Sequence, residues 1–150
     1  MTTNIRIQTE DFDVNDELKA LAREGADIGA IASFVGIVRG DDGLTALRLE
    51  HYPGMTEREI ARHADEACAR WPLDGVTVIH RIGCLKVGER IVFVAVASRR
   101  RAAAFAACEF LMDYLKTKAP FWKEEERGTL RDWVDAKSSD DIAAERWRQE

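Results

Sequence analysis

Two lysines near the end of an apolar stretch are the first residues of this sequence that could do chemistry. Lys116 and Lys123 lie in the segment MDYLKTKAPFWK, where bulky apolar side chains and Pro120 surround them. Partial burial disfavours the charged form of an amine, which then serves as an acid, base or nucleophile near neutral pH. The alternative is that they are ordinary solvated lysines near a helix C-terminus, where the negative end of the helix dipole stabilises a cation. The residues alone leave both interpretations open.

A second group of cations is the run SRRR, from Ser98 to Arg101, between an apolar strand and a helix. Three arginines are unfavourable beside the positive end of a helix dipole. The unpaired backbone N–H groups of a helix start and the guanidinium forks nevertheless suit a phosphate or carboxylate ligand. A solvated basic corner is the alternative. Arg39 ends another apolar strand, and it is either a pocket cation or a strand-end residue that reaches water.

The histidines and glycines form no recognised motif. His51, His63 and His80 lack the spacing of a metal site, so we expect each to be a packing histidine. The stretch GAIASFVG lacks the glycine spacing of a dinucleotide-binding or phosphate-binding loop. No metal or cofactor is expected.

The composition is that of an ordinary folded protein. The chain has 150 residues, of which 46% are hydrophobic and 33% charged, and we expect one domain over 1–150. The net charge of −5 gives no general attraction for nucleic acid or acidic membrane, so anion binding must be local. No apolar run reaches the roughly 20 residues of a membrane span, and the N-terminus lacks a signal pattern. Three cysteines without a CxxC pair argue against disulfides or zinc, and they favour a cytoplasmic protein.

Hydrophobic patterning predicts the strands that must position these residues. Segments 29–38 and 91–98 are apolar on both faces, as covered strands are. Segments 44–52 and 76–83 alternate between apolar and polar residues, and 4–10 is a weaker candidate. RGDDG, at 39–43, predicts a hairpin turn between two antiparallel strands.

Helices are expected between the strands. Thr56 and Glu59 form a capping-box pattern at the start of a helix that ends at Pro72. Shorter helices are expected near 14–23 and 140–148. Strands mixed with helices and a hairpin indicate an α+β fold rather than a doubly wound parallel sheet.

The helix that leads to Lys116 is the longest one expected. Ser98 is its predicted cap, and it continues to about Lys118. Its apolar face should consist of Phe105, Cys108, Met112 and Leu115, at steps of three and four residues.

Four segments share the order and spacing of a known family. They are LEHYPGMTE (49–57), RWPLDGVTVIHRIG (70–83), GERIVFVAVAS (88–98) and FLMDYLKTKAPFWK (110–123). Together they resemble the large, catalytic subunit of molybdopterin synthase, and the similarity runs from about residue 5 to 148. The resemblance implies an α/β hammerhead fold of the α+β class, with a mainly antiparallel sheet flanked by helices. It also implies a homodimer in which each chain carries a small ubiquitin-like sulfur carrier, giving a heterotetramer.

The activity that the resemblance implies is sulfur transfer. The family converts cyclic pyranopterin monophosphate to molybdopterin by installing two sulfurs as a dithiolene. The sulfur arrives as a thiocarboxylate on the carrier's C-terminal Gly-Gly tail. Neither nucleic acid nor membrane is an expected partner.

The resemblance also implies a set of site residues. The two active-site lysines of the family fall on Lys116, expected to be the main catalytic residue, and on Lys123, expected to support it. The other implied substrate-binding positions are Phe34, Ile37, Val38, Arg39, Arg100, Arg101, Met112, Glu124 and Glu125. The family commonly has His-Arg where this chain has Arg100-Arg101. A permanent cation there keeps anion binding, but it supplies no imidazole for proton transfer.

Helix length leads to a prediction about the dimer. In one helix over 99–118, Arg101 and Lys116 would lie about 22 Å apart along the axis. A small ligand cannot contact both from one chain, so we expect Arg100 and Arg101 to reach the Lys116 pocket of the other subunit. Two other functions are compatible with the residues: a module that binds nucleic-acid phosphate through SRRR, and an inactive partner whose lysines only dock a ubiquitin-like tail.

Overall fold

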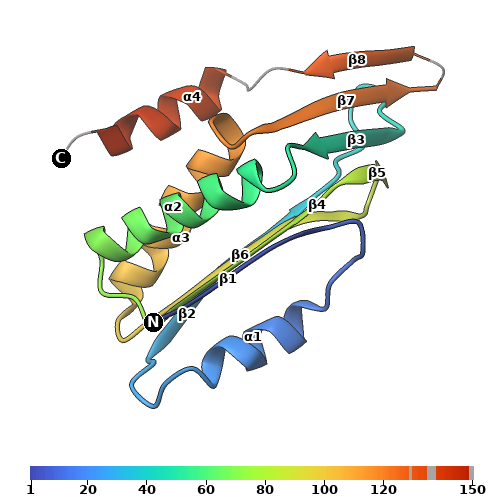
Figure 1. Ribbon diagram of the computed structural model, residues 1–150. Coiled ribbons are helices and arrows are strands. Elements are labelled where there is room, and N and C mark those ends of the chain that lie inside the picture. Colours follow the sequence, from blue (N-terminus) through green and yellow to red (C-terminus); the bar gives the residue numbers. More distant parts are fainter. Residues whose placement is uncertain (129, 135–137, 149–150) are drawn as a thin grey trace.

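The computed structural model describes residues 1–128, 130–134 and 138–148, and its strands form two four-stranded sheets (Figure 1). The first sheet contains, in spatial order, β1 (Thr2–Gln8), β4 (Gly75–Arg81), β6 (Arg90–Ser98) and β2 (Ala30–Ile37). The second contains β5 (Gly83–Lys86), β3 (Ala46–His51), β7 (Phe121–Arg127) and β8 (Leu130–Val134). Neighbouring strands are antiparallel except for the parallel pair β1–β4. The predicted α+β class is therefore confirmed.

Helices cover both faces of the first sheet (Figure 1). They are α1 (Val14–Ala22), α2 (Met55–Arg70), α3 (Arg101–Thr117) and α4 (Ser138–Glu145), followed by a short 3₁₀ turn, Arg146–Arg148. The main core lies between the sheet and α2 and α3, where Val78, Val94 and Leu111 are buried. A second cluster under α1 includes Phe12 and Phe93. The helices expected in these four regions are all present.

The predicted hairpin at RGDDG is wrong. β2 pairs with β6, whereas β3 pairs with β5 and β7, so the segment crosses from one sheet to the other. Asp42 and Gly43 do adopt positive φ, 54° and 76°. A turn signal fixes a local reversal of the chain but not which strands pair.

Strands β5, β7 and β8 did not stand out in the sequence. The predicted strand 76–83 ends early as β4, and Gly83, with a φ of 90°, redirects the chain into β5 of the second sheet. β7 has the sequence FWKEEER, and its run of charged residues obscures the period of two. β7 is a strand because it pairs with β3 and β8, and its own composition does not predict this.

Both predicted helix caps are wrong. The N-cap of α2 is Gly54, whose backbone N–H donates to Glu57 (2.8 Å). Thr56 instead accepts from the N–H of Tyr52 (2.9 Å) and donates to the carbonyl of Pro120 (2.9 Å). A buried hydroxyl bonds the nearest unpaired backbone groups, and here those belong to another segment.

The start of α3 shows the same effect. Its N-cap is Arg100, which makes no side-chain cap bond, whereas the Ser98 hydroxyl donates to the Pro72 carbonyl (2.7 Å). Phe105, predicted on the apolar face of this helix, is 66% exposed. Cys108, Met112 and Leu115 are buried as expected. Ala104, Ala107 and Leu111 are buried as well, so the packed face is wider than the predicted one and does not include Phe105.

Among the described residues, no helix has the length and apolar character that crossing a bilayer requires.

Candidate active site

A pocket of about 540 Å³ opens where the C-terminal end of α3 meets the two sheets. Its wall includes residues of β2, β3 and β6, the last turn of α3, and the first residues of β7. Both Lys116 and Lys123 line it. The other predicted site residues that line it are Phe34, Ile37, Arg39, Met112 and Glu125. The fold thus brings together residues from three separate stretches of the chain.

The two lysines belong to different kinds of secondary structure, a helix and a strand. Lys116 lies in the last turn of α3, which ends as the backbone N–H of Lys118 bonds the carbonyl of Tyr114 (2.9 Å). Pro120 then follows, and β7 begins at Phe121. Because side chains alternate along a strand, Lys123 shares the face of β7 that carries Phe121 and Glu125. The chain therefore reverses direction between α3 and β7, and the second amine, that of Lys123, lines the same pocket as the first.

Burial differs between the two amines. Lys123 is half-buried, as expected, whereas Lys116 is exposed in the single chain. The expectation that both lysines are partly buried is therefore wrong for Lys116. The last turn of α3 stands at the open mouth of the pocket, and no described segment covers it.

Three further charged residues that line the pocket, Arg39, Asp41 and Glu125, take part in ion pairs. Arg39 follows the end of β2 and contacts Asp41 (3.1 Å), and its side chain is 71% exposed, so it reaches the solvent at the rim of the pocket. Glu125 pairs with Arg127 (2.8 Å). Two of the carboxylates that line the pocket are thus already compensated by arginine.

Four of the predicted residues lie outside this pocket. Val38 is buried in the third core cluster, and Glu124 lies 3.9 Å from Arg48. Arg100 and Arg101 are at the other end of α3, and the described residues give them no ion-pair partner. Their neighbour Arg99 pairs with Asp27 (3.2 Å).

His80 lines the pocket, although the sequence indicated only a packing role. Its ring is buried and stacks on Phe121, with centroids 4.0 Å apart. Burial, together with the charges of Lys116 and Lys123, lowers the pKa of His80 to about 4. The sequence carried no signal for this position, because β4 is buried along its whole length and nothing in it marks the pocket.

The C-terminal segment contributes a second unexpected residue, Asp140 of α4. Two contacts hold this segment against Asp113 of α3. Arg146 forms an ion pair with the Asp113 carboxylate (2.9 Å), and the indole N–H of Trp147 donates to the same carboxylate. Trp147 also packs edge-on against Phe110. Asp113 therefore fixes α4 beside the pocket, while its neighbour Met112 faces into it.

These groups define the chemistry that the pocket supports. Lys116, Lys123 and Arg39 supply positive charge for an anionic ligand, and Phe34 and Met112 supply apolar surface for a ring. Among the described residues, no group of three or more His, Cys, Asp or Glu side chains is arranged to hold a metal ion. Fold and pocket together define an α+β protein whose pocket combines amines, a guanidinium and apolar surface, the features that suit an anionic ligand with a ring.

Comparison with known proteins identifies the family. The MoaE protein family model matches residues 7–118. A relative from Mesorhizobium japonicum is 55% identical over 99% of this chain and 95% of its own length, and one from Vibrio cholerae is 51% identical over 98% and 99%. Both are named molybdopterin synthase catalytic subunit. The chain belongs to the MoaE family, and it is a sulfur-transferring enzyme of molybdenum cofactor biosynthesis.

Solved structures of the same family have the same fold as this chain. The molybdopterin biosynthesis MoaE protein from Burkholderia ambifaria superposes with a TM-score of 0.85, at 52% identity over 99% of each chain. Molybdopterin synthase from Staphylococcus aureus gives 0.79, at 29% identity over 86% of this chain and 95% of that one. A chain in the complex of subunits 1 and 2 of molybdopterin-converting factor from Helicobacter pylori has the same fold, with a TM-score of 0.71, 24% identity, and coverage of 91% and 92%. The predicted resemblance is confirmed.

Proposed function

We propose that this pocket is where sulfur passes from the thiocarboxylated C-terminus of a small ubiquitin-like carrier to cyclic pyranopterin monophosphate, forming the dithiolene of molybdopterin. One observation carries the proposal: Lys116 of α3 and Lys123 of β7 converge on one pocket together with Arg39. Family membership supplies the reaction, and the pocket supplies a site with the charge and shape that the reaction needs.

The pocket suits the two halves of the pterin substrate. The cyclic phosphate needs cations, which Arg39 and the two lysines provide. The flat ring system needs apolar surface, for which Phe34 and Met112 are placed on facing elements, β2 and α3.

The carrier meets the same pocket at its open side. A Gly-Gly tail is thin enough to thread beside the exposed Lys116 and present its thiocarboxylate there. Sulfur is already a good nucleophile, so the protein has chiefly to position the reactants and to stabilise charge. Lys116 acts on the thiocarboxylate or on the carboxylate that departs, and Lys123 supports it by binding charge.

A second copy of the chain completes the site. The predicted separation of about 22 Å along α3 keeps Arg100 and Arg101 away from the pocket of their own chain. We place them at the pocket of the partner subunit, where they bind the anionic substrate. The assembly is then a homodimer of this chain with one carrier on each protomer, which the H. pylori complex of two kinds of subunit supports.

A cytoplasmic location agrees with the cysteines. Cys68, Cys84 and Cys108 are all unpaired, as thiols are in a reducing compartment.

Replacing the Lys116 amine tests the proposal. Lys116→Ala should lower dithiolene formation by about 10²- to 10³-fold, because it removes a charge that acts on the reacting groups. The assay combines the purified chain, a thiocarboxylated carrier and the pterin precursor. Carrier binding, measured by calorimetry, should persist.

Lys19→Ala is the matched control, since Lys19 is an exposed lysine on α1 that does not line the pocket. Turnover unchanged in Lys116→Ala would remove Lys116 from the mechanism. Lost carrier binding with normal chemistry at saturating carrier would reduce its role to docking.

A further inference from the structure

The imidazole of His80 lines the pocket and takes no part in the proposed chemistry. It belongs to β4, in the middle of the first sheet, and its ring stacks on Phe121 at the start of β7. The interplanar angle is 21°. The His80 ring therefore packs between β4 and β7, at the pocket that both lysines line.

The backbone decides which nitrogen of His80 carries the hydrogen. Nδ1 lies 2.8 Å from the carbonyl oxygen of Arg81. A carbonyl oxygen only accepts hydrogen bonds, so Nδ1 must be the donor. In the neutral ring Nε2 then carries a lone pair and is an acceptor.

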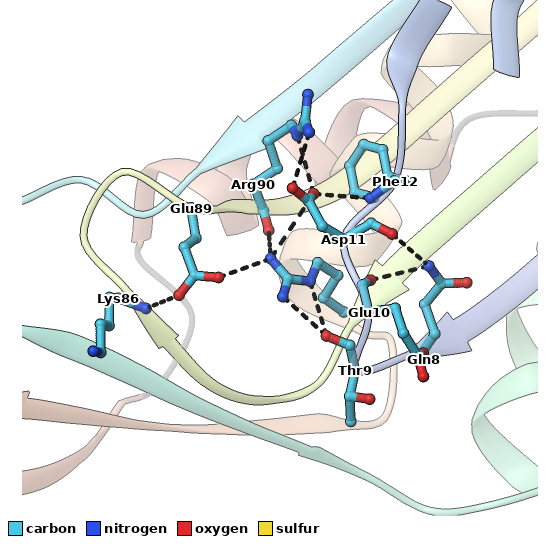
Figure 2. Close-up of polar contacts among 9 residues, drawn as sticks. Gln8, Thr9, Glu10, Asp11, Phe12, Lys86, Glu89 and Arg90 are labelled. Atoms are coloured by element: carbon cyan, nitrogen blue, oxygen red, sulfur yellow. Dashed lines mark hydrogen bonds and ion pairs between the residues drawn. The ribbon is translucent and has the colours of Figure 1, made fainter. Parts of the chain in front are cut away.

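That carbonyl is itself held in place, because the Arg81 side chain ties several segments together. Its guanidinium donates to the carbonyls of Thr9 (2.9 Å) and Arg90 (3.0 Å) and to the Glu89 carboxylate (3.2 Å). Figure 2 shows these partners, with Asp11 bridging toward Arg90. Arg81 is buried, so the end of β4 has little freedom to move. Because this network holds Arg81, it also holds the carbonyl that fixes the tautomer and the orientation of His80.

The charge of the ring is fixed as well. Burial is the largest cause that lowers the pKa of His80, to about 4, and the next electrostatic causes are Lys116 from α3, Lys123 from β7 and His51 from β3. The hydrogen bond to Arg81 acts in the opposite direction but does not outweigh them. The imidazole therefore stays neutral at the pH of the cell.

We propose that His80 is a positioning residue for Lys116: a neutral imidazole of fixed tautomer that offers Nε2 as a hydrogen-bond acceptor to the amine during sulfur transfer. A neutral acceptor orients an ammonium group without adding a third positive charge beside the two lysines. A histidine suits this task because its stacked ring has no freedom to turn away. The role rests on the proposed function, in which Lys116 acts on the thiocarboxylate.

Nitrogen-15 NMR of the chain tests the state of the ring without any activity. We expect the His80 signals to place the hydrogen on Nδ1 and to stay unchanged between about pH 5 and 8, with titration near pH 4. Lys116→Met should raise the pKa of His80, because it removes a nearby positive charge, whereas the surface variant Lys19→Met should leave it unchanged. A hydrogen on Nε2, or a His80 titration that is the same in Lys116→Met, would overturn the proposal.

Kinetics of the complex with the carrier test the role itself. His80→Phe keeps a ring to stack on Phe121 but removes the acceptor, and we expect kcat to fall about 10- to 100-fold. His80→Gln keeps an uncharged acceptor and should stay within about threefold of wild type, with KM for the carrier unchanged in both.

Equal losses in the two variants, or no loss in either, would show that the acceptor has no role. The proposed function fails separately, through a fully active Lys116→Ala. The NMR outcome does not depend on that result, so the two failures are distinguishable.

Discussion

The two pocket lysines show how local geometry assigns different tasks to one residue type. Lys116 stands in the last turn of α3, where a cation is favoured by the helix dipole, and it is exposed. Lys123 is half-buried on a strand that pairs on both sides. In the proposed reaction, the exposed amine is the one that an arriving carrier tail meets, and the half-buried amine holds charge in place. His80 lines the same pocket and carries no charge.

Protonation of His80 should make stability depend on pH. Its pKa is about 4 in the folded chain against 6.5 for the free side chain, so the unfolded chain binds the proton more tightly. The free energy of unfolding should be unaffected by this group above about pH 6.5, and should fall by roughly 3 kcal/mol as the pH drops toward 4. Urea unfolding at a series of pH values measures this.

The matched variant is His80→Phe, which has no proton to bind at this position. The part of the slope that His80 causes should disappear in it. Some slope should remain, because burial also lowers the pKa of His63. Parallel curves for the two proteins would show that His80 is not buried in its neutral form.

At the scale of elements, Arg81 joins the end of β4 to the loop after β1, which is distant in sequence, and to the start of β6. Thr9 follows β1, Glu89 lies in the turn between β5 and β6, and Arg90 begins β6 (Figure 2). Asp11 contacts both Arg90 (2.9 Å) and Arg81 (3.9 Å), and the hydrogen bond from Arg90 lowers the pKa of Asp11 to about 2. The loop between β1 and α1 is thereby anchored to the end of β4, next to His80.

Removing one of these two arginines should cost much more than removing the other. Arg81→Met should lower the free energy of unfolding by about 2–4 kcal/mol, because it leaves the carbonyls of Thr9 and Arg90 without their donor. Arg90→Met removes the stronger contact to Asp11, but both partners are well exposed and screened by solvent, so the loss should be much smaller. Urea titration of both variants compares them directly. Equal losses would mean that the surface pair, and not the buried donor, holds this corner.

At the scale of the whole molecule, the pocket lies where two sheets and a helix end meet, and one chain leaves it open. α3 carries Lys116 at its C-terminal end and Arg100 and Arg101 at its start. A rigid helix separates these groups by its own length. The separation favours an assembly in which the start of one α3 approaches the end of another.

Mixed dimers test this arrangement. Lys116→Ala and Arg101→Ala should each be nearly inactive as homodimers. Refolding the two together should restore about a quarter of wild-type activity, because half of the dimers are mixed and each mixed dimer has one intact site of two. Sites built from a single chain would show no recovery. Mixing Lys116→Ala with Lys123→Ala is the control, since both lysines come from one chain and no recovery is expected.

Much of the fold, the two pocket lysines and Arg39 followed from local patterns, whereas Phe34, Ile37 and Met112 were implied as site residues by the family resemblance. The strands 29–38 and 91–98, the helix that carries Met112 and the lysines on either side of Pro120 were readable because period and composition act over a few residues. β7 and the crossing at RGDDG were not, because strand pairing is decided by partners far away in sequence. Thr56 and Ser98 looked like caps, but each hydroxyl bonds a carbonyl of another segment.

The sequence by itself determined the family, the α+β class and the amines of the pocket, since these depend on residue identity and short-range order. The tertiary structure alone decided that His80 lines the same pocket as those amines, that its ring is neutral, and that Val38 and Glu124 face elsewhere. Burial and electrostatic field arise from groups brought together by long-range packing, and a linear pattern does not record them.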